Sequence, residues 1–188
     1  MTGKDCTTTR ISEILPWYYQ YLFMIFEPSV IIVSLSLIPV SPSNHFHSLA
    51  PTDSNGPFWS NSALHKSCDA ETAWNTPQLR GLWYSYMGAL AFSAVIEPLL
   101  LYVARYKLRD VYDAEEVIKA VLFAFFAFDV FHAGATLAVT GIRAALPASR
   151  MHIYAMVNVW VPTAWMVLRT LWVMGVARKS TVNRMKRE

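Results

Sequence analysis

The length, composition and charge of this chain indicate an integral membrane protein and argue against a soluble domain. Hydrophobic residues make up 54% and aromatic residues 14% of its 188 residues, which is high for a soluble protein. The net charge of +3 is small and the basic residues flank apolar segments, so nucleic-acid binding is not expected. The two cysteines, Cys6 and Cys68, lack metal-ligand spacing, and a disulfide between them is not expected.

Four apolar segments predict an all-α membrane protein, a bundle of four transmembrane helices. Residues 1–13, which precede them, are polar and lack the pattern of a signal peptide. Within the transmembrane domain, residues 14–176, the spans are predicted at about residues 17–38, 82–103, 118–139 and 152–176. Aromatic residues open the first two spans, as is typical of the membrane–water interface. A basic tail, residues 177–188, ends the chain.

The longest connection, residues 39–80, is rich in Ser, Asn, Pro and His, which predicts a loop outside the membrane core. It contains Phe46, Phe58, Trp59 and Trp74, too many aromatic residues for a purely solvated linker. We therefore expect part of the loop to pack as a cap over the bundle. Between the second and third spans, residues 105–116 are predicted to form a short charged connector.

The distribution of Lys and Arg orients the predicted bundle. Eleven basic residues outside the spans or at the end of a span fall on the side of the two termini, and four fall on the opposite side. The larger group comprises Lys4, Arg10, Arg105, Lys107, Arg109, Lys119, Arg178, Lys179, Arg184, Lys186 and Arg187, and the smaller comprises Lys66, Arg80, Arg143 and Arg150. Because positive charge is in excess on the cytoplasmic side, both termini are predicted in the cytoplasm.

The last residues also suggest a compartment. Arg184 and Lys186 resemble the dibasic retrieval signal of endoplasmic-reticulum membrane proteins, with an Arg in place of one Lys. A basic cytoplasmic tail explains them equally well. On this basis the chain is predicted to reside in the endoplasmic-reticulum membrane.

Five ionisable residues are predicted at membrane depth, namely Glu27, Glu97, Asp129, His132 and Arg169. Charges there are costly unless they are paired, protonated or hydrated, and they usually face the bundle interior or a wet cavity. At a rise of ~1.5 Å per residue, the depths of the three acids and Arg169 overlap, so these four are expected to meet in one layer. His132 is expected about one helical turn further from the cytoplasmic side.

Asp129 and His132 give the sharpest chemical signal. They lie three residues apart in the apolar segment 117–139, so a helix places them on one face. The three carboxyl groups exceed what Arg169 and His132 can neutralise, so at least one is expected to be protonated at neutral pH. A protonated acid beside a carboxylate or a neutral His is what general acid and base catalysis needs.

A purely structural interpretation is also open. Arg169 would neutralise Glu97 or Glu27 and lock the fourth helix to its neighbours, while Asp129 and His132 would form an interhelical clamp. Asn158 is expected to link helices by hydrogen bonding.

Three prolines are predicted within the spans. Pro28 and Pro98 each directly follow an intramembrane glutamate, and a proline bends a membrane helix and frees a backbone carbonyl. At these two positions the bend is expected either to serve packing or to open a cavity beside the carboxyl group. For Pro162, packing alone is favoured.

Motifs of other chemistries are missing from the sequence. It contains no glycine-rich phosphate loop, no nucleophile elbow and no His-Glu-x-x-His zinc motif. His45, His47 and His65 could bind a metal, but this pattern in a loop has low specificity. Neither a cofactor nor a metal is therefore predicted.

Several short runs resemble an uncharacterised family of small fungal four-helix membrane proteins, classified as a domain of unknown function. These runs are Leu15-Pro16-Trp17-Tyr18-Tyr19, Phe26-Glu27-Pro28 and Phe128-Asp129-Val130-Phe131-His132, together with Glu97. The resemblance covers about residues 14–175 and implies a fungal origin and a four-span fold. More distantly, a four-helix bundle with intramembrane acids and a His is similar to the EXPERA group of emopamil-binding sterol isomerases, and to small fungal membrane cyclases and isomerases of terpenoids.

The leading hypothesis is a cofactor-independent isomerase or cyclase that acts in the bilayer on a lipophilic, terpenoid or sterol-like molecule of fungal secondary metabolism. The expected roles are acid and base for Asp129 and Glu97, partner or cation stabiliser for Glu27, proton relay for His132, and organiser of the carboxylates for Arg169. The alternative is a non-catalytic membrane protein that binds a lipid or scaffolds other enzymes. Self-association, association with other membrane biosynthetic enzymes and a role as a transporter subunit are left open.

Overall fold

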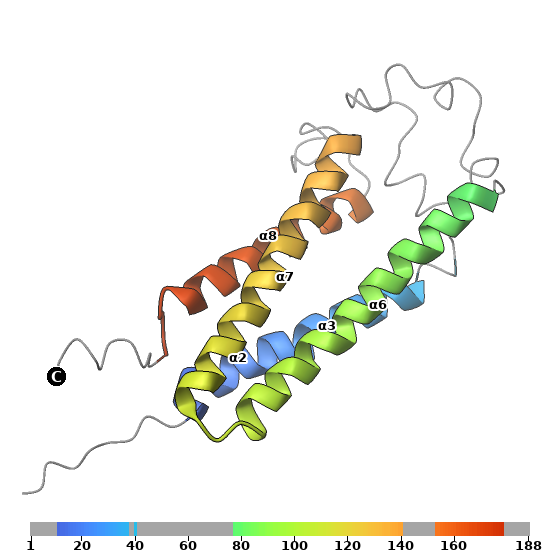
Figure 1. Ribbon diagram of the computed structural model, residues 1–188. Coiled ribbons are helices and arrows are strands. Elements are labelled where there is room, and N and C mark those ends of the chain that lie inside the picture. The colour runs from blue at the N-terminus through green and yellow to red at the C-terminus, as the bar shows by residue number, and fades with distance from the viewer. Residues whose placement is uncertain (1–10, 38–39, 41–76, 141–152, 179–188) are drawn as a thin grey trace, which may run out of the picture.

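The computed structural model describes residues 11–37, 40, 77–140 and 153–178. These described residues form helices and contain no strand, in agreement with the predicted all-α class. The elements are α1 (Ile11–Ile14), α2 (Trp17–Tyr21), the π-helix η1 (Leu22–Phe26), α3 (Glu27–Leu37), α6 (Pro77–Tyr106), α7 (Val111–Thr140) and α8 (Ile153–Val173). α8 packs along α7, and α3 packs along α6, which lies beside α7 (Figure 1). Both cysteines, the loop histidines and most of the predicted cap lie outside the described residues.

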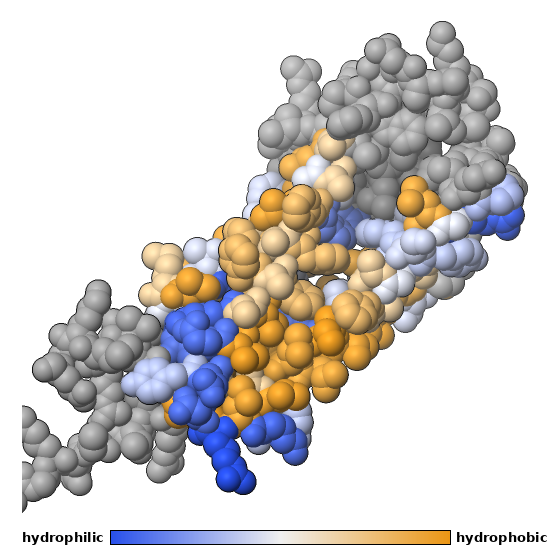
Figure 2. All heavy atoms as spheres, viewed as in Figure 1, coloured by the Kyte–Doolittle hydropathy of each residue, from blue (hydrophilic) through white to orange (hydrophobic). Residues whose placement is uncertain are grey.

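Three helical segments are long and apolar enough to cross a membrane: Trp17–Ser36, Arg80–Tyr106 and Val111–Ala138. The first of them runs through α2, η1 and α3 without a break. Apolar residues cover the middle of the molecule, and hydrophilic residues gather near the end at which α6 leads to α7 (Figure 2). This distribution suits a lipid bilayer. The fourth predicted span corresponds to α8, a helix of 21 residues that is not among the three.

The charged connector predicted at residues 105–116 is mostly helical. Because α6 and α7 both extend into it, only residues 107–110 remain between the helices. The cause is a cap at the start of α7. Asp110 Oδ1 accepts hydrogen bonds from the backbone N–H groups of Tyr112 at 2.7 Å and Asp113 at 3.1 Å. These bonds satisfy backbone donors that would otherwise have no partner at a helix start.

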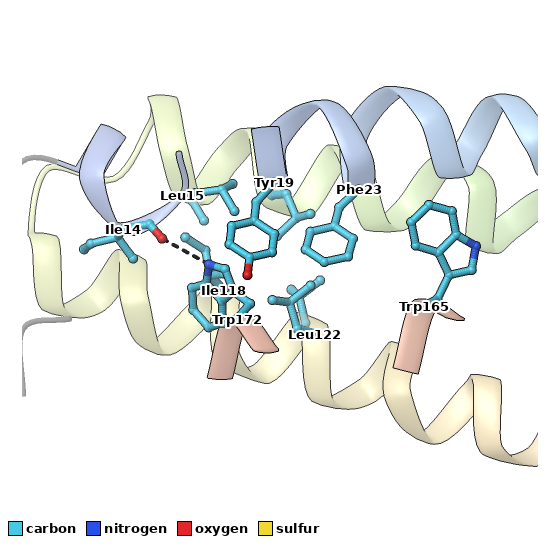
Figure 3. Packing of buried hydrophobic residues seen from close by; sticks show 11 residues of the cluster. Ile14, Leu15, Tyr19, Phe23, Ile118, Leu122, Trp165 and Trp172 are labelled. Atoms are coloured by element: carbon cyan, nitrogen blue, oxygen red, sulfur yellow. Dashed lines mark hydrogen bonds between the residues drawn. The ribbon is translucent and has the colours of Figure 1, made fainter. Parts of the chain in front are cut away.

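The hydrophobic core lies at the end of the bundle where α6 leads to α7 (Figure 3). Its buried side chains are Ile14, Leu15, Tyr19, Phe23, Leu101, Ala104, Ile118, Val121, Leu122, Trp165 and Trp172. The short helix α1, which was not predicted, delivers Ile14 to this core. The Trp172 indole N–H donates to the Ile14 carbonyl oxygen at 3.0 Å, and this hydrogen bond links α1 to α8. Four residues are too few for a hydrophobic period, so α1 has no sequence signature.

α8 ends in a Schellman motif at Gly175. This residue has a φ of +80°, which favours glycine, and its N–H donates to the Trp172 carbonyl oxygen at 2.9 Å. The turn brings Arg178 back onto the bundle, where its guanidinium lies 3.9 Å from the Trp172 ring centroid. Arg178 Nη1 also donates to Glu115 at 2.8 Å, and both side chains are buried. Arg178, counted from the sequence as part of a basic tail, is therefore a packing residue.

Candidate functional site

Arg169 of α8 lies at the centre of a buried cluster with Glu27, Glu97 and Asp129, which we call the charged layer. Arg169 Nη2 donates to Glu27 Oε1 at 2.7 Å and to both carboxylate oxygens of Glu97 at 3.0 Å. Arg169 Nη1 donates to Asp129 Oδ2. All four residues are between 1% and 5% exposed. The four residues thus meet in one layer, as predicted. Their hydrogen bonds link α8 to α3, α6 and α7.

A π-helical turn sets the position of Glu27. Pro28 has no backbone N–H, and its ring excludes an ordinary helical hydrogen bond to the preceding turn. The wider turn of η1 ends at Phe26, directly before Glu27, and absorbs this break while the helix continues as α3. Glu27 is thereby buried in the bundle at the first position of α3. The bend expected at Pro28 takes the form of a π-helix, whereas α6 continues through Pro98 as an α-helix.

Two phenyl rings flank the guanidinium of Arg169. Its central carbon lies 5.5 Å from the ring centroid of Phe23 and 5.7 Å from that of Phe125, distances at which a cation is attracted by the ring face. Two atoms of the charged layer, Arg169 Nε and Glu27 Oε2, are buried without a hydrogen-bond partner among the described residues. A buried polar atom without a partner is costly.

A partly enclosed cavity of about 80 Å³ lies beside the charged layer. Glu27 and Asp129 line it, and the rest of its lining is mainly apolar, with the aromatic rings of Phe125, Phe128 and Trp165. Since a water molecule needs roughly 10–15 Å³ by such a measure, the cavity has room for several waters or for one end of a larger molecule. Glu97 does not line this cavity, and both its carboxylate oxygens accept hydrogen bonds from Arg169 Nη2.

A second polar group consists of Tyr86, His132 and Asn158, of which the last two line the cavity. Asn158 Oδ1 accepts hydrogen bonds from His132 Nε2 at 2.7 Å and from the Tyr86 hydroxyl at 3.3 Å. Asn158 thus links α6, α7 and α8, as predicted. Among the described residues, Asp129 and His132 share no hydrogen bond, because each binds a different partner on α8.

The face that α8 presents to the cavity is a feature that sequence reasoning missed. Asn158, Pro162 and Trp165 line the cavity, and Arg169 follows one turn later. Their spacing of four, three and four residues follows one helix face, which is a signal in the sequence. Pro162, expected to serve packing alone, is part of the cavity wall. No set of three His, Cys, Asp or Glu side chains in the described part of the chain is arranged to hold a metal ion.

Comparisons with known proteins do not identify a family for this chain. No family model, no curated protein and no solved structure matches this chain. The class that the molecule itself defines is a helical protein with three helical segments long and apolar enough to cross a membrane, in which a buried charged layer borders a mainly apolar cavity. The resemblance to small fungal membrane proteins stays a prediction.

Proposed function

We propose that this chain is a cofactor-independent isomerase or cyclase acting on a lipophilic molecule of the terpenoid or sterol-like class. The observation that carries the proposal is the pair of buried carboxyl groups, Glu27 and Asp129, at the wall of a mainly apolar cavity. Two carboxyl groups in one apolar site can take the opposite roles of acid and base. Because the cavity is only about 80 Å³, the reacting end of the substrate enters it and the rest stays outside.

The proposal includes four spans, with both termini in the cytoplasm and the endoplasmic reticulum as the location. α8 has 21 residues, so at ~1.5 Å per residue it is about 31 Å long, enough to cross the hydrocarbon core. Its polar side chains Asn158 and Arg169 are bonded to other helices, which lowers the cost of placing them in a membrane. The excess of Lys and Arg on the side of the termini supports the orientation.

The chemistry requires an acid, a base and stabilisation of positive charge. A protonated carboxyl group donates its proton to one carbon of an alkene, and a carbocation forms at the other. A carboxylate then removes a proton from the neighbouring carbon, so the double bond moves and no atom is gained or lost. In a cyclisation, a second double bond attacks the cation before that proton leaves. Phe125, Phe128 and Trp165 line the cavity, and the face of an aromatic ring favours positive charge.

The geometry revises the expected roles of the five ionisable residues. We assign the acid and base roles to Asp129 and Glu27, because both line the cavity, and His132 is a further proton acceptor on its wall. Glu97, expected as acid or base, is better placed as the counter-ion of Arg169, since both its oxygens accept from Nη2. Arg169 is a positioning residue that holds the carboxylates.

The test compares the metabolites of the producing organism with and without this gene by mass spectrometry. We expect deletion to make one lipophilic compound accumulate while its isomer or cyclised product disappears. Re-expression of Asp129→Asn should not restore the product, although the variant is present in the membrane. Glu116→Gln, an exposed carboxylate on α7, is the matched control and should restore it. Unchanged metabolites on deletion, or full restoration by Asp129→Asn, would overturn the proposal.

A second candidate function is a non-catalytic membrane protein that binds a lipid or scaffolds other enzymes. The observation that favours it is that Arg169 bonds all three carboxylates and so joins four helical elements, which is what a structural clamp does. On this alternative, Asp129→Asn restores every metabolite, whereas loss of Arg169 lowers the amount of folded protein. Because both candidates expect loss of Arg169 to destabilise the bundle, the metabolite profile of Asp129→Asn is the measurement that separates them.

A further inference from the structure

The polar group of Tyr86, His132 and Asn158 converges on one oxygen atom. Asn158 Oδ1 accepts from His132 Nε2 at 2.7 Å and from the Tyr86 hydroxyl at 3.3 Å. An amide oxygen has two lone pairs and can accept both bonds, but it has no hydrogen to donate. The nitrogen of His132 that faces this oxygen must therefore carry the ring proton, because the hydrogen bond of one ring nitrogen decides which of the two is protonated.

The other ring nitrogen, Nδ1, is left as an acceptor. A neutral imidazole has one N–H group and one acceptor nitrogen, whereas a charged imidazole has two N–H groups. Among the described residues Nδ1 has no hydrogen-bond partner, and the carboxylate of Asp129, one turn earlier, is bonded to Arg169. A second proton would bring an unpaired charge into a helix apolar enough to cross a membrane, which is costly. The arrangement therefore favours a neutral His132 with its proton on Nε2.

Neighbouring aromatic rings restrict the His132 ring further. Its centroid lies 5.9 Å from that of Tyr86 and 6.0 Å from that of Phe128. Tyr86 thus lies beside the imidazole with its ring and binds Asn158 with its hydroxyl. His132 lines the cavity, and its Nδ1 is not among the polar atoms that are fully buried without a partner. One ring nitrogen is held by Asn158, and the other keeps accessible surface.

We propose that Asn158 is a positioning residue that acts through His132. Its carbonyl oxygen fixes the ring orientation and the Nε2–H tautomer, and this makes Nδ1 the atom that accepts a proton. The reaction in which this matters rests on the proposed function, whereas the tautomer is a property of the resting protein and needs no turnover to be measured.

The tautomer is measured by nitrogen NMR of the full chain in phosphatidylcholine nanodiscs, with the histidine rings labelled. The spectrum of His132→Phe identifies the signals that belong to His132. At neutral pH we expect a protonated Nε2 and an unprotonated Nδ1. A proton on Nδ1, or on both nitrogens, would overturn the inference.

The positioning role is measured in microsomes, as the rate at which they convert the compound that accumulates on gene deletion. General acid–base catalysis contributes roughly 10²–10⁴-fold, so we expect His132→Phe to lower the rate by about 100-fold or more. Asn158→Leu should lower it by about tenfold or more while His132 is present, and should have no further effect in His132→Phe. Such non-additivity is the signature of two residues that act as a unit, and a purely structural role of Asn158 would not produce it.

Thr163→Val is the matched control on α8. The Thr163 hydroxyl donates to a carbonyl of its own helix, that of Val159, at 2.7 Å, so this variant should keep the rate of the unaltered chain. Should Asn158→Leu not fold, Asn158→Gln, which displaces the amide by one carbon, is compared in the same two backgrounds.

Equal losses with and without His132, or an unchanged rate in the folded Asn158 variant, would overturn the positioning role. The two proposals fail separately. If gene deletion leaves the metabolites unchanged, the isomerase or cyclase is contradicted, and the tautomer is still read from the NMR spectrum. If product forms but Asn158 and His132 act independently, only the positioning role is contradicted.

Discussion

At the scale of single residues, Arg169 is the group on which the site depends. One guanidinium serves three carboxylates from three other helical elements, and it does so through its planar array of N–H donors. Lys has a single donor atom and cannot reproduce this geometry. The carboxylates, in contrast, are in excess, so neutralising one of them removes its repulsion with the other two.

Arg169→Gln is therefore expected to lower the free energy of unfolding by about 3–5 kcal/mol, the range for breaking a buried ion pair. Arg169→Lys should restore only part of this loss. Thermal unfolding of purified variants in detergent measures both. Asp129→Asn is the comparison within the layer and should change stability by no more than about 1 kcal/mol, the net worth of one hydrogen bond. Equal losses in Arg169→Gln and Asp129→Asn would contradict this picture of the layer.

At the scale of elements, irregular helix geometry places the functional side chains. The π-helix η1 precedes Pro28 and leaves Glu27 in contact with Arg169 and the cavity. A π turn holds one residue more than an α turn. If η1 became a regular α-helix, the residues that follow it would rotate about the helix axis by about 100° relative to the residues that precede it. Irregular turns of this kind are frequent at functional sites.

Pro28→Ala tests the role of this turn. Alanine favours a helix interior over proline by about 3 kcal/mol, so propensity alone predicts a gain in stability. We expect the opposite, a lower melting temperature, because a regular helix would turn Glu27 away from Arg169. Pro98→Ala in α6 is the matched control, since no π-helix accompanies that proline. A rise in melting temperature in both variants would show that η1 does not depend on Pro28.

The turn after α8 is a second element whose role is clear from its contacts. Glu115 on α7 is fully buried, and it is held by Arg178 at 2.8 Å and, more distantly, by Lys119 at 3.7 Å. The Schellman turn at Gly175 is what allows Arg178 to reach it. This pair closes the core at the end where the chain leaves α8.

Arg178→Met is expected to lower the free energy of unfolding by about 3 kcal/mol, the lower end of the range for buried pairs, because Lys119 still faces Glu115. Methionine keeps most of the side-chain volume, so the loss reports on the charge. Thermal unfolding measures it, with the exposed Arg109→Met as the control. If the two variants melt at the same temperature, Arg178 belongs to a solvated tail after all.

At the scale of the whole molecule, three zones follow one another along the bundle. The apolar core lies nearest the connection between α6 and α7, the charged layer comes next, and the cavity lies beyond it. In the proposed topology the core faces the cytoplasm, because the connection lies on the same side as the two termini. The cavity is then nearer the lumenal half of the membrane.

Two new glycosylation sites test this topology. Asp5→Asn creates Asn-Cys-Thr near the N-terminus, and Ala63→Thr creates Asn-Ser-Thr in the long connection. We expect only Ala63→Thr to gain a glycan in microsomes, because glycosylation is lumenal and the N-terminus is cytoplasmic. A mobility shift that disappears on deglycosylation is the readout. A glycan on Asp5→Asn, or on neither variant, would contradict four spans with cytoplasmic termini.

The sequence by itself determined the helical class, three segments that form helices long and apolar enough to cross a membrane, and the overlap in position along the bundle of the four charged residues. These follow from composition and from the constant rise of a helix, which are properties of the chain alone. Only the tertiary structure decided which partners the side chains have. Asp129 bonds Arg169 and not His132, Glu97 bonds Arg169 without lining the cavity, and Pro162 forms part of the cavity wall. Helix rotation and the π turn before Pro28 set these contacts, and both depend on how side chains from distant segments pack together.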